Sequence, residues 1–219
     1  MNRILTSKWT KVIVFCLCLV PFGWLLWRIL QNDLTANPSQ FLEHRTGDWT
    51  IRFIVFTLAI SPLRKILHMP ALIRFRRMIG LYAFFYVCLH FTAWIWFDKF
   101  FAWPDMWADV HKRPFITLGF TGFVLLIPLA ITSTAGWIRR MGGKNWQMLH
   151  RLIYLTATLG AIHYYWSQKS DKHKPLEYAA VIAALLLWRL GIWIVDSRKR
   201  AAAGAPKRPQ AAPTTAESA

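Results

Sequence analysis

The sequence predicts an all-α integral membrane protein, a bundle of six transmembrane helices, and two observations support this fold class. Of the 219 residues, 55% are hydrophobic and 16% are aromatic, although the formal net charge is +17. About 20 mostly apolar residues let a helix cross a hydrocarbon core of about 30 Å, and several stretches meet this need with few interior charges. The Lys and Arg residues lie in the connections between these stretches, so no nucleic-acid partner is expected.

Six spans are predicted, at residues 11–30, 49–66, 78–100, 115–137, 146–166 and 176–195. The first apolar run resembles a signal peptide, but it ends in Trp24, Trp27 and Arg28 without a small-residue cleavage site, which favours a retained span. The second span is the weakest. Its clean apolar core covers only residues 53–63 and includes Ser61 and Pro62, which predicts a short, kinked or tilted helix.

Charge in the connections predicts the orientation in the membrane. The connection at 64–77, the turn after Trp137 and the tail after Asp196 are rich in Lys and Arg, whereas the other connections are less basic or contain acids. By the positive-inside rule, both termini of this multi-pass chain are cytoplasmic. The predicted organisation is a cytoplasmic N-terminus (1–10), a membrane domain (11–195) and a disordered basic cytoplasmic tail (196–219) that contacts the lipid bilayer.

Three of the seven histidines, His90, His150 and His163, lie within predicted spans. Ionisable residues at membrane depth are costly, and they indicate a functional site. The other four lie in connections, where a solvated imidazole is the ordinary interpretation: His44, His68, His111 and His173. The three span histidines are therefore the candidate metal ligands.

Depth predicts which histidines pair. At 1.5 Å per residue, His90, His150 and His163 lie roughly 18, 6 and 26 Å from the cytoplasmic ends of their spans. His90 is therefore nearer in depth to His163 than to His150. Two neutral imidazoles from neighbouring helices can ligate a haem iron on both faces, and this closure of both axial positions favours electron transfer over oxygen binding.

The 13-residue spacing between His150 and His163 complicates a second haem on the same helix. At roughly 100° per residue the two side chains point about 140° apart, whereas two haems in one flat seam favour a spacing of about 14. We expect either a local distortion in the fifth span or rings at different azimuths.

Other chemistries stay open as alternatives. The span histidines of a membrane transporter or ion-binding protein could instead handle metal or protons, or could simply be buried and hydrogen-bonded. Against other enzyme classes, the chain has no clustered H-x-x-x-H boxes, no paired acids in its spans, no phosphate-binding Gly-rich loop and no soluble flavin or nicotinamide domain. Electrons must therefore come from another molecule.

Several motifs resemble a known family. They are RFRRMIGLY at 74–82, His90 with the preceding Leu89, KRPFITLG at 112–119, Thr132–Thr134, WQMLHRLIY at 146–154 and IHYYWS at 162–167. Over residues 9–195 the chain resembles the MsrQ family of haem-binding membrane subunits, which is itself similar to the ferric reductase and NADPH oxidase membrane domain.

The resemblance implies a six-helix cytochrome b in the bacterial inner membrane, with His90, His150 and His163 as haem ligands. It implies an electron-transfer subunit without catalytic residues of its own. Electrons would pass from the quinone pool, through quinol or a flavin reductase, to MsrP, a periplasmic molybdenum-cofactor enzyme that reduces methionine sulfoxide in oxidised proteins. The family is also associated with FMN, for which no residue can be assigned.

The sequence departs from the wider oxidase pattern, in which the third and fifth helices each carry two histidines. Here the position 14 residues before His90 is Arg76, so one haem b is expected between His90 and His163, and a second haem at His150 stays open. Candidates for binding haem propionates, quinol or a flavin phosphate are Arg76, Arg77, Arg139 and Arg151, for which plain positive-inside topology is the alternative. An electron carrier to oxygen or ferric iron is a further alternative function.

Overall fold

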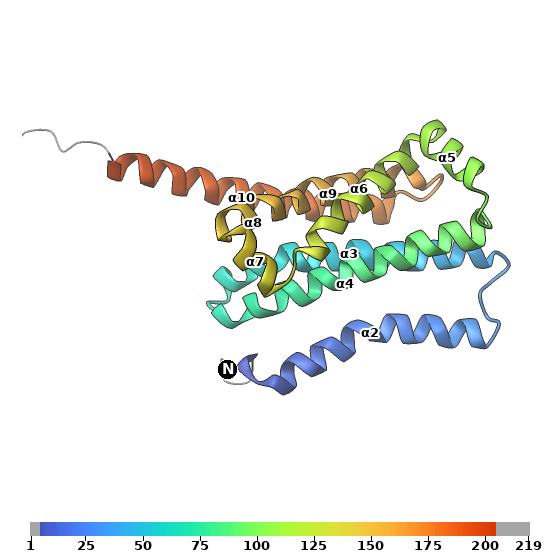
Figure 1. Ribbon diagram of the computed structural model, residues 1–219, viewed down its shortest axis with the longest axis horizontal. Coiled ribbons are helices and arrows are strands. Elements are labelled where there is room, and N and C mark those ends of the chain that lie inside the picture. The colour runs from blue at the N-terminus through green and yellow to red at the C-terminus, as the bar shows by residue number, and fades with distance from the viewer. Residues whose placement is uncertain (1–4, 205–219) are drawn as a thin grey trace, which may run out of the picture.

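The computed structural model describes residues 5–204, with the backbone alone for residues 202–204, and this part of the chain is helical throughout apart from its connections. Six long helices run side by side (Figure 1): α2 (Lys8–Leu30), α3 (Pro38–Ile66), α4 (Ile73–Ala93), α6 (Pro114–Ile131), α9 (Leu152–Ser167) and α10 (His173–Gly204). Shorter elements join them: the 3₁₀ helix η1 (Pro70–Leu72), the π-helix η2 (Trp94–Asp98), α5 (Trp103–Lys112), α7 (Ala135–Met141) and α8 (Gly143–His150). The all-α prediction is confirmed.

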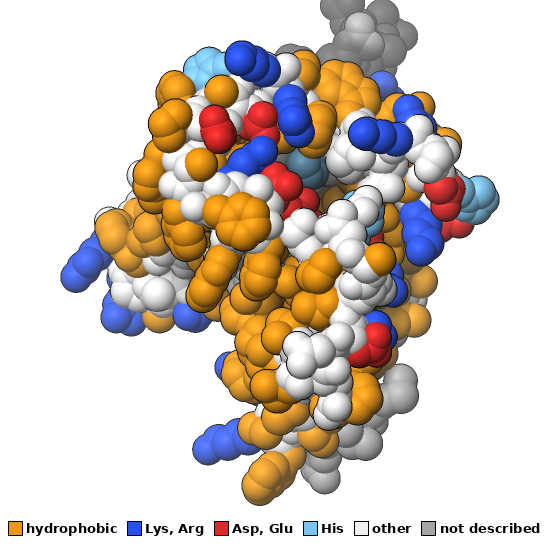
Figure 2. Space-filling model, turned by 90° about the vertical axis from the view of Figure 1, so that its right-hand side faces the viewer, with side chains coloured by type: hydrophobic (Ala, Val, Ile, Leu, Met, Phe, Trp, Pro, Cys, Tyr) orange, Lys and Arg blue, Asp and Glu red, His pale blue; other side chains and the backbone are white. Residues whose placement is uncertain are grey.

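The bundle has two chemically different ends. We call one the α5 end, because α5 lies there with the connections at 31–37 and 168–172. The other, where α2 begins and η1, α7 and α8 lie, we call the basic end (Figure 1), after Arg64, Lys65, Arg74, Arg76, Arg77, Arg139, Arg140 and Lys144. Acidic side chains gather among basic ones on the α5 end (Figure 2).

Among the described residues, four helical segments are long and apolar enough to cross a membrane: Lys8–Leu30, Pro70–Asp98, Pro114–Ile131 and His173–Ala201. The helix α9 has only 16 residues, and α3 carries charged side chains in its first half, such as Glu43 and Asp48. The helix α3 is nevertheless continuous over 29 residues, longer than the weak apolar signal predicts. It begins at Pro38, where the Asn37 side chain accepts a hydrogen bond from the Gln40 amide.

The fourth predicted span is shorter than expected. The helix α6 ends at Ile131 rather than near Trp137. The hydroxyls of Thr132 and Ser133, which follow it, donate hydrogen bonds to the carbonyls of Pro128 and Leu129, at 2.6 and 2.7 Å. The next residue, Thr134, then caps α7 by accepting a hydrogen bond from the Trp137 amide.

The fifth and sixth predicted spans also need correction. The helix breaks at Arg151, which separates α8 from α9, so the local distortion expected between His150 and His163 is present. The helix α10 continues to Gly204, so the predicted disordered tail does not begin at residue 196. Alanines at 201–203 are strong helix formers and extend it. The rest of that predicted tail, 205–219, lies outside the described residues.

Two antiparallel helix pairs make the centre of the bundle. The helix α3 packs along α4, and α6 packs along α9, while α10 covers α3 and α9. Leu58, Tyr86 and Ala157 are almost completely buried where these helices meet. Large apolar side chains outside this core, including Leu155 and Leu187, are exposed, as expected for a surface that faces lipid.

The helix α2 is attached to the bundle mainly through tyrosines of α4. The Tyr86 hydroxyl donates to the Cys18 carbonyl (2.9 Å) and accepts from the Phe22 amide (3.1 Å). This hydroxyl is therefore inserted into the hydrogen-bond ladder of α2, beside Pro21. Both features are recognised causes of helix bending, and α2 bends along its length in Figure 1.

Candidate functional site

Each of the two central helix pairs holds one of the three span histidines near the α5 end. On α4, the His90 Nδ1 atom lies 2.9 Å from the Glu43 carbonyl oxygen of α3 and 3.4 Å from the Thr46 hydroxyl. On α9, the His163 Nδ1 atom lies 2.7 Å from the Phe115 carbonyl oxygen of α6. In both pairs, therefore, a backbone carbonyl of the neighbouring helix contacts the Nδ1 atom of the imidazole.

These hydrogen bonds decide which nitrogen of each ring carries the proton. A backbone carbonyl can only accept, so Nδ1 of His90 and of His163 must donate. The Nε2 atom of each neutral ring then keeps its lone pair. Histidines that bind metals usually donate their other N–H in this way, which fixes the ring orientation and raises the basicity of the ligating nitrogen.

A glycine lies against each of the two rings. A Cβ atom added to Gly119 of α6 would lie 2.7 Å from Nδ1 and 2.8 Å from Cε1 of His163. One added to Gly47 of α3 would lie 3.2 Å from Cε1 of His90. The missing side chains thus provide the space in which the imidazoles sit against the neighbouring backbones.

The two rings lie next to each other in an edge-to-face arrangement. Their centroids lie 6.1 Å apart, at an interplanar angle of 74°. A metal ion bound by two imidazole nitrogens at about 2 Å each would separate the ring centres by roughly 6 Å. Phe91, which follows His90 on α4, stacks on Phe123 of α6 at 4.5 Å, so apolar rings lie close to the pair. The donor set, its tautomers and its spacing therefore fit a bis-histidine haem iron.

His150 is not brought to either of these histidines. It ends α8, where its ring stacks on Trp146 at 3.9 Å and its Nδ1 lies 3.1 Å from the Trp146 carbonyl oxygen. Its Nε2 lies 3.4 Å from the Ser133 hydroxyl. The structure therefore separates His150 from the candidate pair, as the depth argument predicts.

The four arginines predicted to bind a cofactor differ in their exposure to solvent. Arg77, Arg139 and Arg151 are exposed at the basic end. Arg76 is only partly exposed, and it lies close enough to His150 for their charges to interact. Of the four candidates, Arg76 is the one that the structure does not leave exposed.

Comparison with known proteins gives the family. The model of the ferric reductase like transmembrane component matches residues 46–161, which run from α3 into α9. A relative from Herminiimonas arsenicoxydans is 52% identical over 89% of this chain and 90% of its own length. Another, from Caulobacter vibrioides, is 48% identical over the same shares. Both are called protein-methionine-sulfoxide reductase heme-binding subunit MsrQ. The chain belongs to the MsrQ family.

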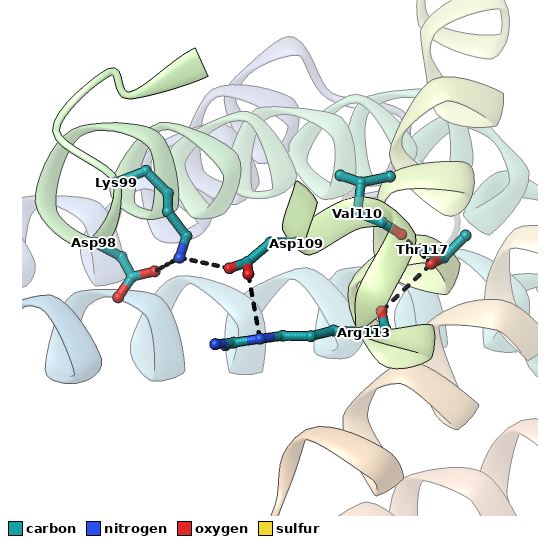
Figure 3. Close-up of polar contacts among 6 residues, drawn as sticks. All are labelled: Asp98, Lys99, Asp109, Val110, Arg113 and Thr117. Carbon is teal, nitrogen blue, oxygen red and sulfur yellow. Dashed lines mark hydrogen bonds and ion pairs between the residues drawn. The ribbon is translucent and has the colours of Figure 1, made fainter. Parts of the chain in front are cut away.

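A polar network closes the α5 end of this MsrQ-family chain. Lys99 forms ion pairs with Asp98 (3.2 Å) and Asp109 (2.5 Å), and Arg113 pairs with Asp109 at 3.3 Å (Figure 3). The Thr117 hydroxyl donates to the carbonyls of Val110 and Arg113, at the start of α6. The network therefore joins the end of η2 to α5 and to α6, the helix that carries Gly119.

Glu43 is a second polar feature beside the histidine pair. Its carbonyl accepts from His90, while its side-chain Oε1 is buried without a hydrogen-bond partner in the described part of the chain. It precedes the predicted second span. Burial is the main cause that raises the pKa of Glu43 to about 7, helped by the Asp98 carboxylate and opposed by Lys99.

Sequence reasoning missed Gly47, Gly119 and Arg189 in this MsrQ-family member. Gly119 closes the KRPFITLG motif, but nothing local shows that it faces a histidine 44 residues later. Arg189 did have a usable signal, because it is an arginine deep within the predicted span 176–195.

Proposed function

We propose that the chain is a haem-binding membrane subunit that carries electrons across a bilayer, with haem b between His90 and His163. The observation that carries this proposal is the close approach of the two rings, each of which has its Nδ1 atom hydrogen-bonded to a carbonyl, so that the lone pair of its Nε2 atom would be the one to bind iron. The names of the MsrQ relatives support haem binding. When bound, haem iron supplies one-electron oxidation and reduction.

The residues of the chain do the remaining work. The carbonyls of Glu43 and Phe115 keep both imidazoles in the ligating tautomer, and Gly47 and Gly119 let them sit close to the backbone. His90 and His163 would hold the haem, and a haem held by two histidines would supply electron transfer rather than oxygen binding. Among the described residues, no group of three or more His, Cys, Asp or Glu side chains could hold a metal ion.

We further propose that the basic end is cytoplasmic in a bacterial inner membrane, by the positive-inside rule. The histidine pair, near the α5 end, is then close to the periplasm. Electrons from quinol or a flavin reductase would enter at the basic end and leave at the α5 end to MsrP, a periplasmic molybdenum-cofactor partner, for methionine sulfoxide reduction. FMN binding is proposed on the family resemblance alone. A second haem at His150 would need an axial ligand other than histidine.

Reduced-minus-oxidised visible spectra of the purified chain test the haem site. His90→Ala and His163→Ala should each remove the bis-histidine haem, seen as loss of the sharp reduced bands and a lower haem-to-protein ratio. His150→Ala should retain that haem, and His111→Ala, at an exposed ring on α5, is the matched control. If His150→Ala removed all haem while His163→Ala kept it, the proposed pair would be wrong.

A further inference from the structure

Arg189 of α10 is a positive charge held by neutral groups within the bundle. Its Nη1 donates to the Tyr154 hydroxyl (2.9 Å) and its Nη2 to the Leu58 carbonyl (2.8 Å). The Arg189 guanidinium also lies over the Tyr154 ring, 5.1 Å from its centroid. Its Nε is buried, with no hydrogen-bond partner among the described residues. An arginine so placed is costly unless an anion compensates its charge.

A second arginine meets the same tyrosine. Arg76 of α4 lies close enough to Tyr154 and Arg189 for its charge to interact with both. Two arginines from different helices therefore lie near one phenol, and Arg189 donates a hydrogen bond to it. Like charges so close repel, and a single neutral hydroxyl oxygen does little to offset this.

The described part of the chain provides no carboxylate to compensate these charges. Its ion pairs involve neither Arg76 nor Arg189. Its acidic residues lie toward the α5 end, apart from Asp196. Asp196 is two turns beyond Arg189 on α10, about 10 Å along the helix. The converging arginines thus lack an anionic partner from the chain itself.

We propose that Arg76, Arg189 and Tyr154 form a binding site for an oxyanion, the phosphate or carboxylate of a ligand with an apolar body. A phosphate or carboxylate accepts charge-assisted hydrogen bonds from guanidinium groups better than any neutral oxygen does. The apolar body follows from the neighbours of Arg189 on α10, because Leu187, Trp188 and Leu190 are large apolar side chains that are exposed on the surface of the bundle.

This oxyanion site is separate from the histidine pair. Arg76 lies 14 residues before His90 on α4, about 21 Å along the helix, and Tyr154 lies nine residues before His163 on α9, about 13 Å along it. The site can therefore be tested in protein that keeps its bis-histidine haem. Failure of the oxyanion site would leave the proposed function untouched.

The test is a ligand titration of the haem-loaded full chain in neutral detergent, followed by the thermal unfolding midpoint. The probes are phosphatidylglycerol, FMN and added haemin, which distinguish a lipid phosphate, a flavin phosphate and a haem carboxylate, with phosphatidylcholine as the control of zero net charge. At least one probe should raise the midpoint of the wild type. Arg189→Gln should weaken the apparent affinity for that probe at least about tenfold.

Variants keep the test decisive. Arg76→Gln should weaken the same probe, whereas Arg198→Gln, which removes an exposed charge farther along α10, should not. Arg189→Lys, which keeps the charge but loses the planar fork, should give a smaller loss and serves if the glutamine variant does not fold. An unchanged reduced haem spectrum will show that the bundle is intact. Equal titrations in wild type and the Arg189 and Arg76 variants, or no response to any probe, would overturn the oxyanion site.

Discussion

Gly119 and Gly47 set how closely the backbones of α6 and α3 approach the two candidate haem ligands. At 2.7 Å from His163 Nδ1, a Cβ on Gly119 would overlap an atom that is already fixed by the Phe115 carbonyl. The ring cannot retreat without losing that hydrogen bond. The same holds less severely at Gly47, where the Cβ would lie 3.2 Å from the His90 ring. The glycine positions are thus part of the ligand geometry.

Gly119→Ala should therefore disturb the haem site directly. We expect the added methyl to cost on the order of 1–3 kcal/mol of packing energy and to displace the His163 ring. The reduced visible spectrum should weaken or shift, and the haem-to-protein ratio should fall by more than half. Gly122→Ala is the matched control, because a Cβ there would lie 3.9 Å from Leu159 Cβ and 4.0 Å from Thr156 Cγ2, at ordinary contact distance. A normal spectrum in Gly119→Ala would contradict the inference that His163 needs the space left by Gly119.

The raised pKa of Glu43 predicts that the stability of the folded chain depends on pH. Its pKa is about 7 in the folded chain, against an ordinary value of 4.5, so the folded chain binds its proton more tightly than the unfolded chain does. Stability should then fall as the pH rises from about 4.5 through 7, by at most about 3 kcal/mol. Glu43→Gln should flatten this fall, measured as the unfolding midpoint at pH 5 and pH 8. Asp105→Asn, at an exposed carboxylate, should keep the wild-type pH dependence.

At the scale of the helices, each candidate ligand depends on a pair rather than on its own helix. His90 of α4 is oriented by α3, and His163 of α9 by α6, so the separation of the two rings is set by how the pairs pack against each other. The helix breaks at Arg151, between α8 and α9, which is 12 residues before His163. This break lets α8 turn His150 toward Ser133 without moving His163.

The connection between α7 and α8 depends on Gly142, which has φ of +74° and ψ of 147°. Residues with a side chain rarely adopt this conformation, so Gly142→Ala should lower the unfolding free energy by on the order of 1–3 kcal/mol. Gly143→Ala, one residue on, should have little effect, because its added Cβ would meet nothing within 4 Å. Chemical unfolding in detergent would compare the two. Equal stabilities would show that the α7–α8 connection tolerates another conformation.

At the scale of the whole molecule, apolar length was enough to predict α2, α4, α6 and α10. The helix α3 gave a weaker signal because Glu43, Asp48 and Arg52 interrupt its apolar run, and the break at Arg151 could not be located from composition. The fixed rise of a helix predicted that His90 and His163 lie together, and their rings are 6.1 Å apart. Their role as ligands stays a prediction.

The contacts that orient these histidines could not be predicted from the sequence. The Glu43 and Phe115 carbonyls and the two glycines approach the rings only because the helices pack in one register, with partners 43 to 48 residues apart in the chain. Backbone carbonyls also carry no residue-type signal, since every residue has one. Local pattern therefore gives the depth of a side chain, and only packing gives its partners.

Charge distribution predicts the direction of electron flow, and this can be measured. The turn between α7 and α8 is bordered by Arg139, Arg140 and Lys144, whereas α5 carries Asp105 and Asp109. Positive connections are retained in the cytoplasm during insertion, so α5 should face the periplasm. A haem at the histidine pair, near the α5 end, would then transfer electrons toward the periplasm.

Single cysteines report this orientation once Cys16, Cys18 and Cys88 are replaced by alanine. Asp105→Cys and Lys144→Cys are both at exposed positions, at the α5 end and the basic end. In intact spheroplasts, a membrane-impermeant maleimide should label Asp105→Cys and leave Lys144→Cys unlabelled, whereas both should react after permeabilisation. If only Lys144→Cys were labelled in intact spheroplasts, the chain would have the opposite orientation in the membrane. The histidine pair would then lie near the cytoplasm, where it could not serve a periplasmic acceptor.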